Sequence, residues 1–74
     1  MAQQQVEAEV GGTVCRIECA VGSSLVEGDA IIVVESMKME VPLAAPADAR
    51  LLTLFVAVGD IVAEGQAVAM IEIT

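Results

Sequence analysis

An internal duplication constrains the fold of this chain more than any other feature of its sequence. When the sequence is shifted by 37 positions, residues 14–35 align with residues 51–72, and seven of the 22 aligned pairs are identical. Most other pairs exchange one apolar residue for another, and both copies share the pattern Val-Gly-x-x-apolar-x-Glu-Gly-x-Ala. Turn glycines that recur at a fixed offset indicate two copies of one structural unit.

Each copy is typical of a strand, a glycine turn, a short extended piece, a second glycine turn and another strand. The glycines expected to take positive φ in these turns are Gly22, Gly28, Gly59 and Gly65. We predict strands at residues 6–10, 13–21, 30–36, 39–44, 50–58 and 67–73, with extended pieces near 25–27 and 62–64. Many short strands without helical periodicity predict an all-β fold, a small sandwich or flattened barrel.

Lys38 is the only lysine, and it lies within Glu35-Ser36-Met37-Lys38-Met39-Glu40 between two predicted strand ends. We expect Met37 and Lys38 at the tip of the hairpin. A two-residue hairpin turn needs positive φ and favours Asn-Gly, so this turn is either wider or strained. The repeat places the counterpart of Lys38 just beyond Thr74. If a pseudo-twofold axis relates the halves, the chain ends lie near one pole and Lys38 near the other.

A lysine in a turn is in itself unremarkable, since most such lysines are ordinary surface residues. Met37 and Met39 argue against that interpretation here, because apolar residues are unusual at an exposed tip. Exposed methionines suit a surface that adapts to several partners. A single lysine also leaves only the α-amine as a competing target for acylation. We therefore interpret Lys38 as a site of covalent loading.

Size and charge limit the remaining possibilities. With 74 residues the chain is one domain, in which we expect a flexible N-terminus at residues 1–5 and the folded domain at residues 6–74. The net charge of −8 disfavours nucleic acid and favours basic protein surfaces as partners. No apolar run is long enough for a membrane span, and the N-terminus does not resemble a secretory signal.

The two cysteines, Cys15 and Cys19, are too far apart along a predicted strand for a disulfide, because four residues span roughly 13 Å. We expect both as free thiols among the core residues, in a reducing and therefore cytoplasmic compartment. A metal site is disfavoured, since the chain has neither histidine nor a Cys-x-x-Cys pair.

The Val-Gly turn of both halves, Glu-Ser-Met-Lys-Met, and Ala-Pro-Ala-Asp at 45–48 resemble the biotinyl/lipoyl carrier domain family, especially its biotin carboxyl carrier branch of stand-alone attachment proteins. The resemblance implies a flattened barrel of two four-stranded antiparallel sheets with quasi-twofold symmetry. It also implies that Lys38 carries covalent biotin, flanked by Met37 and Met39 and surrounded by Glu35, Ser36 and Glu40. Ala49 departs from the family, where glycine is usual.

The same resemblance implies a non-catalytic carrier subunit or domain. A biotin protein ligase would load Lys38, and carboxybiotin would pass from a biotin carboxylase to a carboxyltransferase of a carboxylase acting on an acyl-CoA or a keto acid. The residues themselves show no catalytic constellation. Two alternatives stay open: a lipoyl or dual carrier, although that branch usually has Asp-Lys-Ala, and an unmodified interaction domain.

Overall fold

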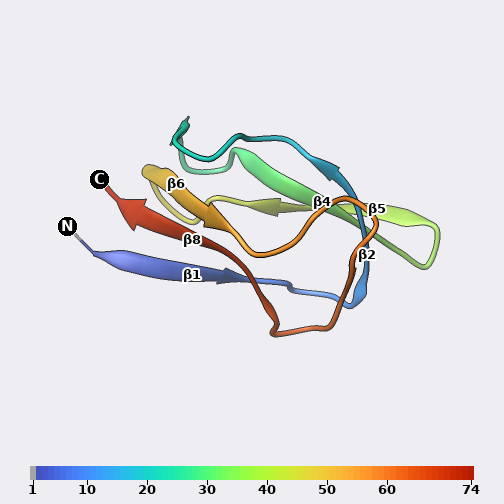
Figure 1. Ribbon diagram of the computed structural model, residues 1–74. Helices are drawn as coiled ribbons and strands as arrows, with labels where there is room; N and C mark the ends of the chain where they lie inside the picture. The colour runs from blue at the N-terminus through green and yellow to red at the C-terminus, as the bar shows by residue number, and fades with distance from the viewer. Residues whose placement is uncertain (1) are drawn as a thin grey trace.

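The computed structural model describes residues 2–74 as eight strands in two sheets (Figure 1). The strands are β1 (Gln3–Glu7), β2 (Gly12–Ile17), β3 (Ser24–Leu25), β4 (Ala30–Ser36), β5 (Met39–Ala44), β6 (Ala49–Leu54), β7 (Ile61–Val62) and β8 (Ala67–Ile73). One sheet has the order β1-β8-β6-β3 and the other β5-β4-β2-β7, with antiparallel pairing throughout. The prediction of two four-stranded antiparallel sheets is confirmed. Across residues 2–74, no helix has the length and apolar character needed to cross a bilayer.

The two halves of the chain build equivalent parts of the two sheets. A shift of 37 residues superimposes the bounds of β2, β3 and β4 on those of β6, β7 and β8. The register slips between Val14 and Arg16 in the β2–β4 pair, and between the equivalent Leu51 and Thr53 in the β6–β8 pair. Positive φ values between 84° and 95° occur at all four repeat glycines, Gly22, Gly28, Gly59 and Gly65.

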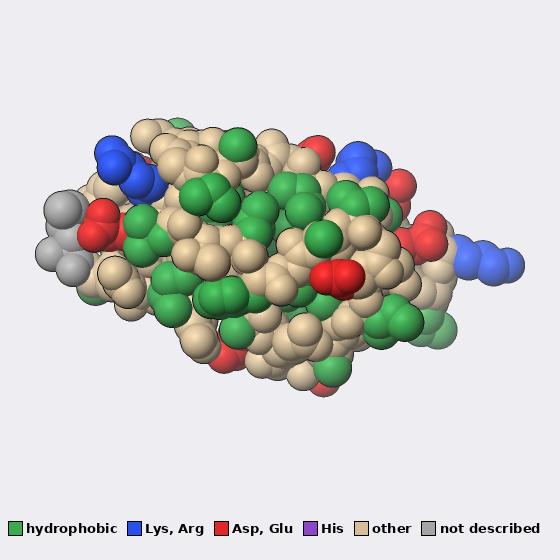
Figure 2. Space-filling view, in the orientation of Figure 1, with side chains coloured by type: hydrophobic (Ala, Val, Ile, Leu, Met, Phe, Trp, Pro, Cys, Tyr) green, Lys and Arg blue, Asp and Glu red, His purple; other side chains and the backbone are tan. Residues whose placement is uncertain are grey.

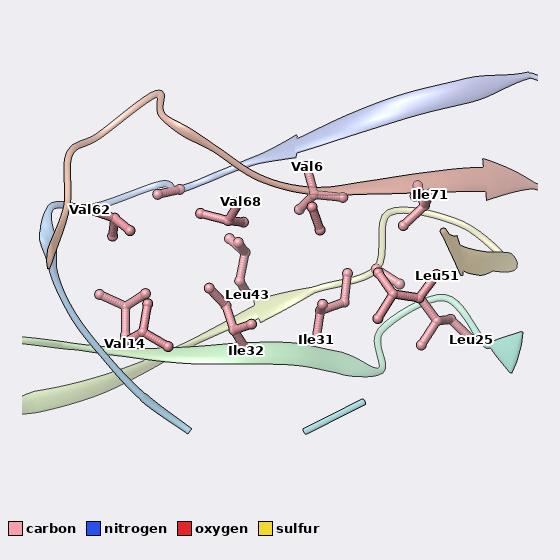
Figure 3. Close-up of a cluster of buried hydrophobic side chains, with 14 of the residues drawn as sticks. Val6, Val14, Leu25, Ile31, Ile32, Leu43, Leu51, Val62, Val68 and Ile71 are labelled. Carbon is pink, nitrogen blue, oxygen red and sulfur yellow. The ribbon is translucent and has the colours of Figure 1, made fainter. Parts of the chain in front are cut away.

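The core lies between the sheets and is aliphatic, as expected from a chain with one aromatic residue (Figure 3). Phe55 itself is half-exposed. Each sheet contributes its inward face, and the largest fully buried side chains are Val14, Ile31, Ile32, Leu51, Val68 and Ile71. Burial of each such side chain contributes about 1.5–3 kcal/mol, so this core is the main source of stability.

The slip beside Cys15 breaks the regular alternation of a strand at 13–21, in which Cys15, Ile17, Cys19 and Val21 would share one face. β2 ends at Ile17 and not at residue 21, and Val21 is exposed in a turn and not on the core face. Cys19 packs against the core, whereas Cys15 is the extra residue of the bulge, half-buried, with its Sγ 3.3 Å from the Val33 carbonyl oxygen. A bulge moves the side chains that follow it to the other face of the sheet, so a strict alternation of period two does not predict which face they occupy. Both thiols are free, as predicted.

The N-terminal strand also begins earlier than predicted. Gln3 to Gln5, expected to be flexible, are paired in β1 with β8, in a register that sets Gln3 opposite Glu72. Only Val6 of this edge strand is buried, so its polar residues carry little periodicity to detect. Met1 lies outside the described residues. β6 likewise ends at Leu54, four residues before the predicted end at 58.

The body is elongated, 36 × 17 × 17 Å, and its two ends differ. The β4–β5 hairpin closes one end, here called the lysine pole (Figure 1). The two chain ends lie at the other end, the terminal pole, where the Ile73 N–H donates to the Ala2 carbonyl over 2.8 Å. This opposition of Lys38 and the chain ends follows the pseudo-twofold relation that the repeat predicted.

Candidate functional site

The turn at the lysine pole contains two residues, Met37 and Lys38. The last pair of the β4–β5 ladder is Ser36 with Met39, so only Met37 and Lys38 form the turn. Its two central residues have φ values of 51° and 66°, as in a type I′ hairpin turn. Within residues 2–74 they are the only residues other than glycine with positive φ. Left-handed backbone costs such residues about 1–2 kcal/mol each. Of the two alternatives left by the sequence, the strained two-residue turn is correct.

The strands behind the turn hold it in this conformation. β4 buries four consecutive residues, Ile31 to Val34, and β5 buries Leu43 opposite Ile32. Strained backbone persists where the surrounding structure over-determines it, and a six-pair ladder anchored in the core meets that condition. The tip is therefore held at a fixed distance from the body.

The Lys38 side chain is exposed, and it is accompanied by exposed methionines. Met37 is 92% and Met39 66% exposed, while Ser36 is half-buried. In Figure 2 a side chain in the colour of Lys and Arg projects from the end of the molecule where the β4–β5 hairpin lies, with hydrophobic side chains beside it. The ion pairs found in residues 2–74 involve Arg16 and not this amine.

Acidic residues line the base of the hairpin. Glu35 and Glu40 lie directly opposite each other, an arrangement in which like charges repel. The Arg16 Nη1 lies 2.9 Å from a Glu40 carboxylate oxygen, and its Nε lies 3.7 Å from Glu18. The hydrogen bond to Glu40 is the main cause that raises the pKa of Arg16. Arg16 thus compensates Glu40 and leaves Glu35 outside the ion pairs of the described chain.

Two residues that sequence reasoning did not assign to the site support it from β2. Arg16 belongs to the predicted strand at 13–21, and no residue near it in the sequence links it to the lysine hairpin. Gly12 lies so close to β4 that an added Cβ would be 2.2 Å from the Glu35 carbonyl oxygen. The pairing of β2 with β4 makes both contacts, and no local pattern in the sequence reveals that pairing. The predicted residues, from Glu35 to Glu40, all lie in the hairpin.

The chemistry available at this pole is that of one accessible primary amine. Such an amine forms an amide when another protein supplies an activated carboxyl group. The exposed side chain on a strained, well-anchored turn fits a covalently held group that must reach active sites on other proteins. The hairpin has no histidine and no nucleophile–base pair to perform a reaction of its own.

This chain is similar to known proteins over most of its length. The model of the family described as "Biotin-requiring enzyme" matches residues 4–71. A biotinylated protein, the TB7.3 homolog of Mycobacterium leprae (strain TN), is 32% identical over 68 residues, which cover 92% of this chain and 96% of that protein. The biotin-dependent acyl-coenzyme A carboxylase alpha3 subunit of the same organism is 36% identical over 67 residues, or 90% of this chain.

The chain spans only 11% of that carboxylase subunit, so the likeness concerns one domain of a larger protein. The same holds for a solved structure of a single-chain, multi-domain long-chain acyl-CoA carboxylase. It is similar over 97% of this chain and 7% of its own length, with a TM-score of 0.92 and 29% identity. From the match over residues 4–71, this chain belongs to the family of biotin-requiring enzymes, as a biotinyl/lipoyl carrier domain.

Proposed function

We propose that this chain is a biotin carboxyl carrier whose biotin is held in an amide bond to Lys38. The observation that carries this proposal is the position of the only lysine, exposed on a strained two-residue turn at the free end of a rigid body. The family match and the biotinylated relative support biotin as the cofactor.

Loading requires a biotin protein ligase and uses the Lys38 Nζ as the nucleophile. The uncharged amine attacks the acyl carbonyl of biotinyl-adenylate, the new C–N bond forms, the bond to AMP breaks, and the amine loses a proton to solvent. Amide formation removes the only positive charge at the tip, so the loaded pole is more acidic than the free one. Bound biotin supplies a ureido nitrogen that carries a carboxyl group between a biotin carboxylase and a carboxyltransferase.

The contribution of the chain itself is tethering. Because the turn is anchored by β4 and β5, the loaded side chain stays at the end of a rigid body 36 Å long. A tethered group is delivered at a high effective concentration, which replaces a bimolecular encounter at each transfer. We place the carrier in the cytoplasm with a carboxylase that acts on an acyl-CoA, which the two free thiols and the similar acyl-CoA carboxylases support.

Intact mass and peptide mapping, after incubation with biotin, ATP and a biotin protein ligase, test the assignment. The wild type should gain one biotinyl group on Lys38. Lys38→Arg should gain none and keep the wild-type circular dichroism and melting temperature, because the side chain lies outside the core. Labelling of Lys38→Arg would contradict the site.

A matched variant tests whether biotinylation requires the turn or whether any exposed lysine is sufficient. Arg50 is an exposed cation on β6 at the terminal pole. The double variant Lys38→Arg, Arg50→Lys should stay unlabelled, since its lysine lies within a strand. A parallel reaction with lipoate and a lipoyl ligase, using a known lipoyl domain as a positive control, separates the lipoyl alternative. No modification by either ligase would favour an unmodified interaction domain.

A further inference from the structure

The quasi-twofold symmetry provides an internal control, because the strand residues at the lysine pole have counterparts at the terminal pole. Across the outer face of the sheet β5-β4-β2-β7, the pairing register aligns Glu40, Glu35, Thr13 and Ile61 in one row. The equivalent row of the other sheet contains Gln3, Glu72, Arg50 and Ser24. Features shared by the two rows belong to the fold, and differences between them are free to serve a function.

The row at the lysine pole is the more apolar and the more acidic of the two. Ile61 is 81% exposed where its counterpart is Ser24, and Thr13 stands where the other row has Arg50. Val62, the next residue in the chain, is buried in the core. Because side chains alternate along a strand, the Ile61 side chain points outward. A short edge strand normally carries polar residues, so an exposed isoleucine there is unusual.

A second exposed apolar side chain extends this region, but it is shared with the terminal pole, where its repeat counterpart Val21 is 58% exposed. Ile61 is therefore the apolar residue that distinguishes the two poles. Val58, 61% exposed, lies in the turn before β7, and the Gly59 N–H of that turn donates to the Val14 carbonyl over 2.8 Å. The turn is thereby held beside Thr13. We call the outward-facing group of Thr13, Glu35, Val58 and Ile61 the β7 corner. It combines apolar side chains with one carboxylate that no arginine compensates among residues 2–74.

The β7 corner lies within reach of any protein that docks on the lysine. Adjacent strands are about 4.8 Å apart, so Ile61 is roughly 10 Å across the sheet from Glu35, which is three residues from Lys38. A stable complex buries about 800 Å² on each partner, a patch of roughly 16 Å radius. A partner that encloses the tip from this side of the sheet therefore covers Ile61 as well.

We propose that the β7 corner is a docking surface for the biotin protein ligase, with Ile61 seated in a shallow apolar depression beside a basic side chain that pairs with Glu35. This inference rests on the proposed function. The ligase is favoured over later partners because it must bind the carrier before biotin is attached. Its affinity for the carrier therefore comes only from protein surface around Lys38, whereas the carboxylase and transferase also bind the biotin. The net charge of −8 favours a basic partner.

The kinetics of biotin transfer to Ile61→Ser test this surface. The substitution installs the residue found at the equivalent position of the terminal pole. We expect kcat/KM for the carrier to fall about tenfold or more through KM, as when an apolar anchor is removed from an interface. The control is Val26→Ser, which removes a 62% exposed apolar side chain at the terminal pole and should leave kcat/KM unchanged. A second variant, Ile61→Thr, keeps the β-branched side chain that suits a strand.

The outcomes separate this inference from the proposed function. Selective loss in both Ile61 variants, with melting temperatures near that of the wild type, supports the β7 corner. Wild-type kcat/KM in Ile61→Ser, or an equal loss in Val26→Ser, overturns the docking surface while leaving biotin on Lys38 intact. A wild-type carrier that receives no biotin on Lys38 overturns the proposed function and this surface with it.

Discussion

Replacement of Gly12 by alanine is expected to destabilise this domain strongly. A Cβ at this position would lie 2.2 Å from the Glu35 carbonyl oxygen and 2.9 Å from the Val34 Cγ1. The first of these atoms belongs to the backbone of β4 and the second to a buried side chain. Neither moves freely, so β2 would have to shift by roughly 1 Å to restore an ordinary contact.

The magnitude follows from the cost of overpacking. Extra methyl groups in a well-packed interior cost about 1–3 kcal/mol, and we place Gly12→Ala at the upper end because the closest atom is backbone. For a domain of this size, each kcal/mol lowers the melting temperature by roughly 4–8 °C. A loss of about 3 kcal/mol is a large part of the stability of a domain this small. Urea denaturation followed by circular dichroism measures it directly.

Gly11→Ala is the matched control, since its Cβ would meet its nearest atom, the Val62 carbonyl oxygen, at 3.5 Å. We expect this variant to stay within about 0.5 kcal/mol of the wild type. Equal free energies of unfolding for the two variants would refute the reasoning. The repeat counterpart of Gly12 is Ala49, whose own Cβ is buried in the core. Equal stabilities would therefore show that β2 can move away from β4 far enough to hold an alanine.

Three further predictions concern packing, thiol chemistry and a loop contact. Leu51→Ala should lower the free energy of unfolding by about 2–5 kcal/mol, measured by urea denaturation. Leu52→Ala, at the half-buried neighbouring position, should lower it clearly less. Burial is the main cause that raises the pKa of Cys19. In a variant that lacks Cys15, alkylation of Cys19 near pH 8 should therefore be slower in the folded protein than in the urea-unfolded protein. The free energy of unfolding should also decline as the pH rises above the pKa of the unfolded thiol, because only the unfolded state then loses its proton. Asp48→Ala removes the acceptor 3.0 Å from the Glu27 N–H and should cost about 1 kcal/mol, measured in the same urea assay.

The strands that sequence reasoning placed correctly are those bounded by turn residues. β4, β5 and β8 begin and end where predicted, because glycine turns precede β4 and β8 and the lysine hairpin joins β4 to β5. The glycine turns themselves were predicted from the repeat, and their positive φ values confirm it. Here the local sequence and the fold demand the same conformation.

The ends of β2 and β6 were predicted too far along the chain because apolar residues continue past the paired segment. Cys19 still packs against the core after the ladder of β2 has ended, so alternation alone does not mark the end of pairing. The bulges beside Cys15 and Leu52 are set by the partner strands. Register of this kind is a property of the pair and not of either strand.

The candidate site shows the same division between local and distant information. The position of Lys38 at a hairpin tip followed from the residues around it. Arg16 and Gly12 could not be assigned to the site, because they meet Glu40 and Glu35 only after β2 has paired with β4. Contacts between residues some twenty positions apart depend on topology, which the repeat constrains but does not specify.

The two poles together indicate why the strain lies at Met37 and Lys38. At the terminal pole β1 pairs with β8, with Gln3 opposite Glu72, and no residue other than glycine has positive φ there among residues 2–74. At the lysine pole the ladder would accept Asn-Gly, which adopts a type I′ turn at little cost. The fold therefore requires a turn here but neither of these two residues. Under the proposed function, attachment requires the lysine at the tip, on a turn that the paired strands β4 and β5 join directly to the core. The turn therefore keeps a strain of about 1–2 kcal/mol per residue.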